Sequence, residues 1–200
     1  MWVGCLTSNL LWGELEMINC YLAGPIFTER DRMFLSYLAD GIRGIWPELN
    51  LYVPHENAAI NDKTKSANSK QIYDGDMARL KNTDLLIAVV SGDMPPIGTT
   101  CEVGIFSQMQ EADCSKHLVC LYDDCRNVKD AVDSDEKMEA FRADFAESQW
   151  HYINLFLVGC IKTHGKLVAT SKELFDAIEK EREFYRNFNK AEPEELAENE

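Results

Sequence analysis

Basic residues are scarce in this sequence, which has 20 lysines and arginines against 34 aspartates and glutamates and a formal net charge of −14. No cluster of lysine and arginine forms a positive stripe along the chain. Nucleic acids and anionic membrane surfaces bind to concentrated positive charge, so the composition argues against both as partners. A small neutral ligand is compatible with this negative field, whereas a highly phosphorylated one needs a basic pocket that the sequence does not display.

The sequence also lacks a recognisable targeting or membrane-spanning segment. Residues 1–16 are rich in leucine and tryptophan, but they have no basic n-region and fall short of the ~20 apolar residues that cross a bilayer. We interpret residues 1–17 as an amphipathic N-terminal extension and residues 18–189 as a single domain. Residues 190–200 form an acidic tail that we expect to be disordered. We expect the protein to be cytoplasmic.

Paired cysteines are missing as well, since no C-x-x-C motif occurs among the seven cysteines. Their odd number and mostly apolar neighbours indicate reduced thiols in a cytosolic protein. The 4 histidines are scattered without the spacing of a zinc site. We therefore predict no metal site.

Several signature motifs of other enzyme classes are absent. The chain contains no G-x-G-x-x-G fingerprint, no P-loop, no G-x-S-x-G elbow and no H-E-x-x-H helix. Their absence argues against dinucleotide-dependent, NTP-dependent, serine-hydrolase and zincin chemistry. A pair of carboxylates remains as the candidate machinery, the set that serves acid/base and covalent chemistry at a glycosidic carbon.

Short apolar runs alternate with segments of helical periodicity along the chain. Strands are predicted at 18–23, 51–53, 85–90, 118–122 and 166–169, and helices at 29–46, 69–82, 99–112, 135–150 and 171–189. This alternation is typical of an α/β fold in which helices cover both faces of a parallel sheet. In such folds the ligand lies at the carboxyl ends of the strands, which directs the search to residues 23–30, 54–58, 91–102 and those from 123 onward.

Glu102 is the first candidate catalytic residue. It follows the irregular loop 91–98 and lies in the segment G-T-T-C-E at 98–102, which is expected to open a helix. In the first turn of that helix the positive end of the dipole would keep the carboxylate ionised, as a nucleophile requires. The same residues also fit a T-x-x-E capping box from Thr99 to Glu102, in which the carboxylate has only a structural role.

Asp76 is the second candidate, in the helix predicted over 69–82. Ile72, Asp76 and Leu80 are spaced i, i+4 and i+8, and this spacing predicts a carboxylate in the middle of the face that meets the core. Burial raises the pKa of a carboxyl and suits it to acid/base catalysis. The alternative is a structural carboxylate that pairs with backbone amides or with Arg79.

Two aromatic residues near the first strand, Tyr21 and Phe27, fit ordinary core positions when taken alone. Four motifs, however, give the chain a resemblance to a known family: Y-L-A-G-P at 21–25, V-P-H-E-N at 53–57, Y-D-G-D-M at 73–77 and G-T-T-C-E-V-G at 98–104. In order and spacing, from about residue 18 to residue 177, they resemble the nucleoside 2-deoxyribosyltransferase family. The resemblance implies a flavodoxin-like sheet of five parallel strands, and homo-oligomers whose subunits share active sites.

The resemblance also implies a role for each matching residue. Glu102 is implied as the nucleophile, Asp76 as the acid that protonates the leaving base, and Tyr21 as the residue that positions the nucleophile. The implied reaction moves a 2-deoxyribosyl group from a 2′-deoxynucleoside to another purine or pyrimidine base by double displacement, with net retention and without a cofactor. The substrate-binding set is Gly24, Phe27, Asp93, Gly98 and Asn154, in which Phe27 packs on the nucleobase and Asn154 reaches the sugar site of a neighbouring subunit.

Two positions depart from the family pattern. Pro96 stands where members commonly carry a sugar-binding aspartate, and Ala58 stands where glutamine or glutamate is frequent. Asp93 or Glu56 could replace the missing aspartate if the loop 91–98 folds back. The departures leave open an N-glycohydrolase of nucleosides or nucleoside 5′-monophosphates on the same scaffold, although only two arginines, at 30 and 32, lie near the first loop. A binding domain without turnover is a third interpretation, which the retained carboxylates argue against.

Overall fold

A computed structural model describes residues 17–57, 68–91, 95–124 and 153–191. Within them, five parallel strands form one sheet in the order β2-β1-β3-β4-β5. The strands are β1 (Asn19–Ala23), β2 (Asn50–Tyr52), β3 (Leu85–Val89), β4 (His117–Leu121) and β5 (Lys166–Val168). The predicted α/β fold with a parallel sheet is confirmed, and the ends of each predicted strand lie within a single residue of those observed. The strand order is that of flavodoxin-like doubly wound sheets.

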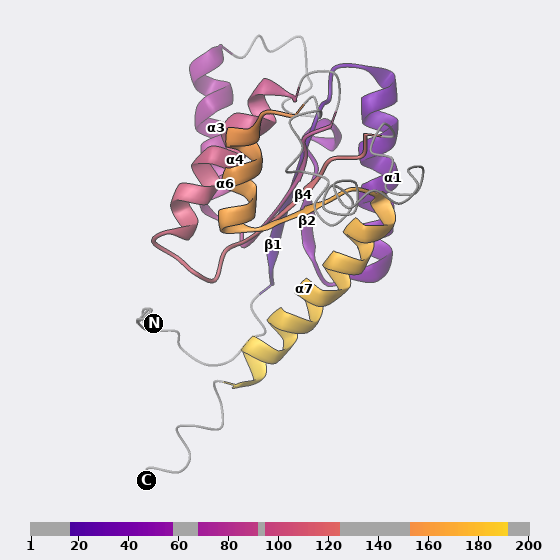
Figure 1. The fold of residues 1–200 in the computed structure, drawn as a ribbon, viewed down its shortest axis with the longest axis vertical. Helices are drawn as coiled ribbons and strands as arrows, with labels where there is room; N and C mark the ends of the chain where they lie inside the picture. The colour runs from indigo at the N-terminus through magenta and orange to yellow at the C-terminus, as the bar shows by residue number, and fades with distance from the viewer. Residues whose placement is uncertain (1–16, 58–67, 92–94, 125–152, 192–200) are drawn as a thin grey trace, which may run out of the picture.

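Helices cover both faces of this sheet (Figure 1). α1 (Glu29–Ile45) and α7 (Ser171–Ala191) lie on one face, and α3 (Ser69–Lys81), α4 (Ile97–Gln110) and α6 (Leu155–His164) lie on the other. A short 3-10 helix, η1 (Pro54–Glu56), follows β2. α7 runs on to Ala191, into the segment 190–200 interpreted as a tail.

The strands send alternate side chains into two separate cores. In β1, Cys20 and Leu22 pack with the α1 and α7 side, whereas Tyr21 and Ala23 pack with the α3, α4 and α6 side. β3 alternates in the same way, and all of its residues are buried. The alternation places the phenol of Tyr21 on the face of the sheet that carries α4.

Two helices differ from the sequence prediction. α4 begins at Ile97 rather than at Thr99, with Pro96 as its N-cap, because a proline at a helix start has no amide that needs a partner and its fixed φ suits the entry. α6 was not predicted, although Asn154 before an apolar run is a recognisable N-cap signal. The helix predicted over 135–150 lies outside the described residues.

The chain leaves β1 and β3 toward opposite faces of the sheet, since α1 follows the first strand and α4 follows the other. Doubly wound folds bind their ligands in the crevice that opens at this point, beyond the carboxyl ends of the two strands. Gly24 lines the turn after β1, where an added Cβ would lie 2.8 Å from Leu35 Cδ2 and 3.2 Å from Val89 Cβ. A larger residue at position 24 would push this turn away from β3.

Candidate active site

A hydrogen bond between Tyr21 and Glu102 joins β1 to α4, the helix that follows β3 at this switch point. The Tyr21 hydroxyl, from β1, donates to Oε1 of Glu102, from α4, at 2.6 Å. Tyr21 is 2% exposed, and burial together with the Glu102 carboxylate raises the pKa of its phenol far above the usual range. The hydroxyl therefore stays protonated and acts as a fixed donor to the carboxylate. This is the contact that a residue positioning a nucleophile must make.

The carboxyl of Glu102 is largely shielded from water. Desolvation raises its pKa to about 7, the hydrogen bond from Tyr21 opposes that rise, and the charge of Asp76 adds to it. Glu102 lies in the second turn of α4, beyond the first turn in which a helix dipole acts. The prediction that the dipole keeps this carboxylate ionised was therefore wrong. The capping-box alternative is also wrong, because Thr99 lies inside the helix and is buried.

Asp76, from α3, completes a pair of interacting carboxyls. The helices that carry Asp76 and Glu102 pack against each other, and the Asp76 charge raises the pKa values of both Glu102 and Tyr21. The pKa of Asp76 itself is raised by desolvation, and the positive charge of Arg79 works against that rise. Because the Asp76 charge disfavours the ionised form of Glu102, the titrations of the two carboxyls are coupled. One acid and one carboxylate side by side are what acid-assisted nucleophilic substitution needs.

The apolar stripe predicted along α3 is present only at its carboxyl end. Leu80 is buried, Asp76 is half-buried, and Ile72 is 48% exposed. The expected burial of Ile72 was wrong, because only the last turn of α3 packs into the core and its earlier turns extend past it. Asp76 thus lies at the rim of the crevice, where a ligand can reach it and cover it.

The other described residues predicted to bind substrate make no recorded side-chain contact with Tyr21, Asp76 or Glu102. Phe27 is 92% exposed in the loop before α1. Asn154 caps α6, and its side-chain oxygen accepts hydrogen bonds from two amides of that helix at 2.9 and 3.4 Å. Gly98 lies in the first turn of α4, where an added Cβ would meet nothing within 4 Å. Asp93 lies outside the described residues. Within one chain, therefore, Phe27 does not pack against the carboxyls, and Asn154 serves as the N-cap of α6.

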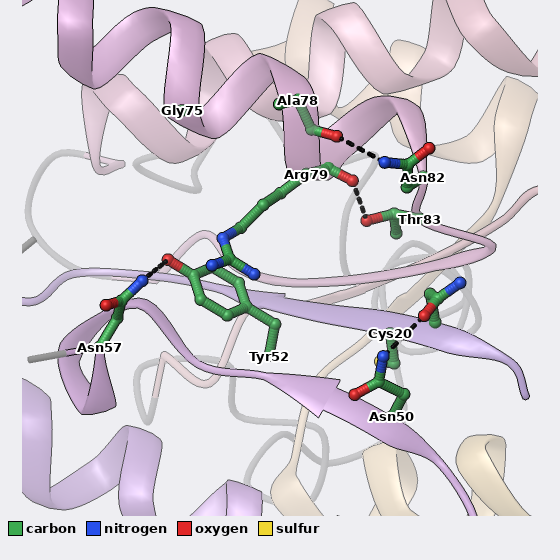
Figure 2. A pocket seen from close by; sticks show the side chains of 10 residues that line it. Cys20, Asn50, Tyr52, Asn57, Gly75, Ala78, Arg79, Asn82 and Thr83 are labelled. Atoms are coloured by element: carbon green, nitrogen blue, oxygen red, sulfur yellow. Dashed lines mark hydrogen bonds between the residues drawn. The ribbon is translucent and has the colours of Figure 1, made fainter. Parts of the chain in front are cut away.

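Sequence reasoning missed a second aromatic layer behind Tyr21. The ring of Tyr52, from β2, meets the ring of Tyr21 edge to face, with centroids 5.2 Å apart. The Arg79 guanidinium lies 3.7 Å from the centroid of the Tyr52 ring, and Asn57 Nδ2 donates to the Tyr52 hydroxyl at 3.3 Å (Figure 2). These three side chains line an open cavity of about 540 Å³ beside α3. The one signal in the sequence was a tyrosine in each of two strands, and only the strand register, which pairs Tyr21 with Tyr52, reveals that they touch.

Three further properties concern only the part of the chain that the structure describes. It contains no group of three or more histidine, cysteine, aspartate or glutamate residues placed to hold a metal ion. None of its helices is long and apolar enough to cross a membrane. Its cysteines at positions 20, 101, 120 and 160 are free thiols.

Fold and site together define a small doubly wound α/β protein with two interacting carboxyls at the switch point of its sheet. The family model described as nucleoside 2-deoxyribosyltransferase matches residues 20–183 of this chain. The chain belongs to that family, whose members act on nucleosides and nucleobases. The resemblance found in the sequence motifs is thereby confirmed.

The chain matches 22 chains among solved structures. A conserved protein from Enterococcus faecalis V583 is 34% identical with a TM-score of 0.67, and the match covers 82% of this chain and 98% of that one. The 2-desoxiribosyltransferase from Leishmania mexicana is 19% identical with a TM-score of 0.41, over 54% of this chain and 65% of that one. This second likeness is too low to support a conclusion. A search of curated protein sequences finds no match to the chain.

Proposed function

We propose that this protein transfers the 2-deoxyribosyl group of 2′-deoxynucleosides from one purine or pyrimidine base to another. The observation that carries the proposal is the hydrogen bond from buried Tyr21 to Glu102, with Asp76 beside it, in the crevice beyond β1 and β3. An oriented carboxylate with an acid next to it is the machinery for covalent substitution at a glycosidic carbon. Membership of the family supports the same class of reaction.

The reaction proceeds in two substitution steps at C1′. An oxygen of Glu102 forms a bond to C1′ as the bond from C1′ to the base breaks, and the Asp76 carboxyl gives its proton to the departing nitrogen. A nitrogen of the second base then attacks C1′, the ester to Glu102 breaks, and Asp76 takes the proton that the incoming base loses. Two inversions at C1′ leave the configuration retained.

Substrate binding decides which carboxyl holds the shared proton. In the free protein burial raises the pKa of Glu102 to about 7, so Glu102 holds a proton below that pH. A bound nucleobase covers Asp76 and removes water from it, which raises its pKa, while Glu102 keeps the hydrogen bond from Tyr21 that favours its ionised form. The proton therefore passes to Asp76 and leaves Glu102 as the nucleophile.

A homo-oligomer that shares active sites belongs to this proposal. Phe156 is 88% exposed and Leu155 is 40% exposed at the start of α6, directly after Asn154. Exposed apolar side chains of this kind are typical of a surface that another subunit covers. In such an assembly Asn154 and Phe27 reach a site that they do not reach within their own chain.

Hydrolysis on the same scaffold is the second candidate, and Pro96 is the observation that favours it. Pro96 caps α4 and has no side-chain group that could hold a sugar hydroxyl, so the glycosyl intermediate is less firmly held and more open to water. A nucleoside 5′-monophosphate is less well supported, because Arg32 Nε is engaged with the carbonyl of Ile26 at 2.7 Å and Arg30 lies in solvent beside Asp31.

The test is to incubate the protein with deoxyinosine, with and without adenine, and to follow both bases, both nucleosides and free sugar by chromatography. If the protein is a transferase, deoxyadenosine should form when adenine is present. The Glu102→Ala variant should fold but form no deoxyadenosine. Steady release of hypoxanthine with no deoxyadenosine at any adenine concentration would replace transfer by hydrolysis.

Pro96→Asp should raise the ratio of new nucleoside to free sugar, and an unchanged ratio would show that Pro96 does not set this ratio.

A further inference from the structure

Tyr52 holds together three elements that the catalytic groups depend on. Its ring packs edge to face on Tyr21 at 5.2 Å, and Arg79 from α3 covers it at 3.7 Å. Asn57, directly after η1, donates to its hydroxyl at 3.3 Å. Figure 2 shows the Arg79 side chain reaching down from α3 to the ring and Asn57 approaching from the other side. Tyr52 is therefore fixed from α3, from β1 and from the segment after β2.

The contacts continue from Tyr52 to the reacting carboxylate without a gap. Arg79 packs on Tyr52, Tyr52 packs on Tyr21, and the Tyr21 hydroxyl donates to Glu102 at 2.6 Å. The edge-to-face contact limits the tilt of the Tyr21 ring, and the tilt decides where its hydroxyl points. A hydrogen bond of 2.6 Å tolerates little displacement, because its strength falls steeply with distance and angle.

The same contacts tie the two carboxyls to each other. Arg79 lies one turn after Asp76 on α3, and only the last turn of that helix is buried. Leu80, Met77 and the packing on α4 also hold α3, and the Arg79 stack on Tyr52 adds a contact between this helix and β2. A single aromatic ring thus sets the position of Tyr21 on one side and of the helix that bears Asp76 on the other.

We propose that Tyr52 is a positioning residue, which, clamped by Arg79, holds the Tyr21 ring at the angle that directs its hydroxyl to Glu102. Tyr52 touches neither reacting atom, and its effect on catalysis passes through Tyr21. The inference rests on the proposed function for its kinetic consequences, but not for its effect on the titration of Glu102.

The test compares Tyr52→Phe, which keeps the ring, with Tyr52→Leu, which removes it. Tyr52→Leu should lower kcat roughly 10- to 100-fold, the loss expected when a reacting group is misoriented, and should leave KM within about threefold. Tyr52→Phe should retain kcat within about threefold, because both ring contacts remain. Tyr37→Leu is the matched control, since Tyr37 also has an edge-to-face partner, at 5.9 Å, but lies on α1 across the sheet. Equal losses of kcat in Tyr52→Leu and Tyr37→Leu would overturn the proposal.

A double-mutant cycle separates positioning from general loss of structure. In the Tyr21→Phe background no hydroxyl remains to be aimed, so adding Tyr52→Leu should cost less than about threefold in kcat. A full 10- to 100-fold loss in that background would show that Tyr52 acts by another route and would overturn the proposal.

A readout without turnover keeps this inference distinct from the proposed function. Titration of the Glu102 carboxyl by carbon NMR should show a higher pKa in Tyr52→Leu than in wild type, in the direction of Tyr21→Phe, because the hydrogen bond that favours the carboxylate is weakened. Tyr52→Phe should titrate as wild type does. A wild type that releases no base refutes the proposed function alone, whereas an unshifted Glu102 titration in Tyr52→Leu refutes the role of Tyr52.

Discussion

Replacing Tyr21 by phenylalanine removes the hydroxyl that donates to Glu102 and keeps the buried ring. The lost hydrogen bond runs from a neutral donor to a carboxylate at 2.6 Å. Hydrogen bonds to charged groups contribute about 1.5–3 kcal/mol, and one pKa unit corresponds to about 1.4 kcal/mol. The pKa of Glu102 should therefore rise above its value of about 7 by roughly one to two units.

This rise has two consequences for turnover. The reactive form of the pair has Glu102 ionised and Asp76 protonated, so a higher Glu102 pKa lowers its population and reduces kcat/KM about 10- to 100-fold near neutral pH. The alkaline limb of the kcat/KM profile reports loss of the last proton from the pair, and it should move to higher pH by the same one to two units. Initial rates of base release from deoxyinosine across the neutral and alkaline range measure both. An alkaline bend at the same pH as in wild type would refute the role given to this hydrogen bond.

Three further predictions concern stability and pH. Glu102→Gln should stabilise the protein on the order of 2–3 kcal/mol at about pH 8 and not at about pH 4. The reason is that the pKa of Glu102 is about 7 in the folded protein and 4.5 ordinarily, so wild type loses stability as the pH rises between these two values. Equal urea midpoints for the two proteins at both pH values would contradict this. Asn154→Ala should cost about 1 kcal/mol through loss of the α6 cap, and Asn154→Ser should cost less; urea unfolding decides, and an unchanged midpoint in the alanine variant would count against the cap. Arg79→Met should move the acid limb of kcat/KM to higher pH, because desolvation raises the pKa of Asp76 and the Arg79 charge opposes that rise, while Lys81→Met on the same helix should not; an acid limb at its wild-type position in Arg79→Met would contradict the assignment.

The sheet could be predicted from the sequence because its strands carry a strong local signal. The runs at 85–89 and 118–121 are apolar on both faces, as strands covered by helices on both sides must be. Glu102 and Asp76 could be found because motifs and the rule for strand ends direct attention to the same edge of the sheet. The packing of α3 against α4 shows that the two segments meet.

What the sequence could not supply depends on contacts between distant segments. The pKa of Glu102 follows from its burial by the surrounding fold. The helix dipole is the local feature visible in the sequence, but Glu102 lies beyond the first turn of α4, where that dipole acts. Tyr52 and Arg79 gain their place from the register of β2 against β1 and from the height of α3, neither of which a local pattern encodes. The exposure of Ile72 likewise depends on how far α3 extends beyond the core, which helical periodicity does not specify.

The central claim is that Glu102 forms a bond to the sugar, and the mass of the intact protein tests it most directly. Wild type mixed with a deoxynucleoside and no acceptor base, then quenched in acid, should gain the mass of one deoxyribosyl group. Peptide mapping should locate that mass at Glu102, and adenine added before the quench should remove it as deoxyadenosine forms. Glu102→Ala should gain nothing under the same conditions. Base release by wild type without any adduct, or an adduct of equal amount in Glu102→Ala, would contradict the account.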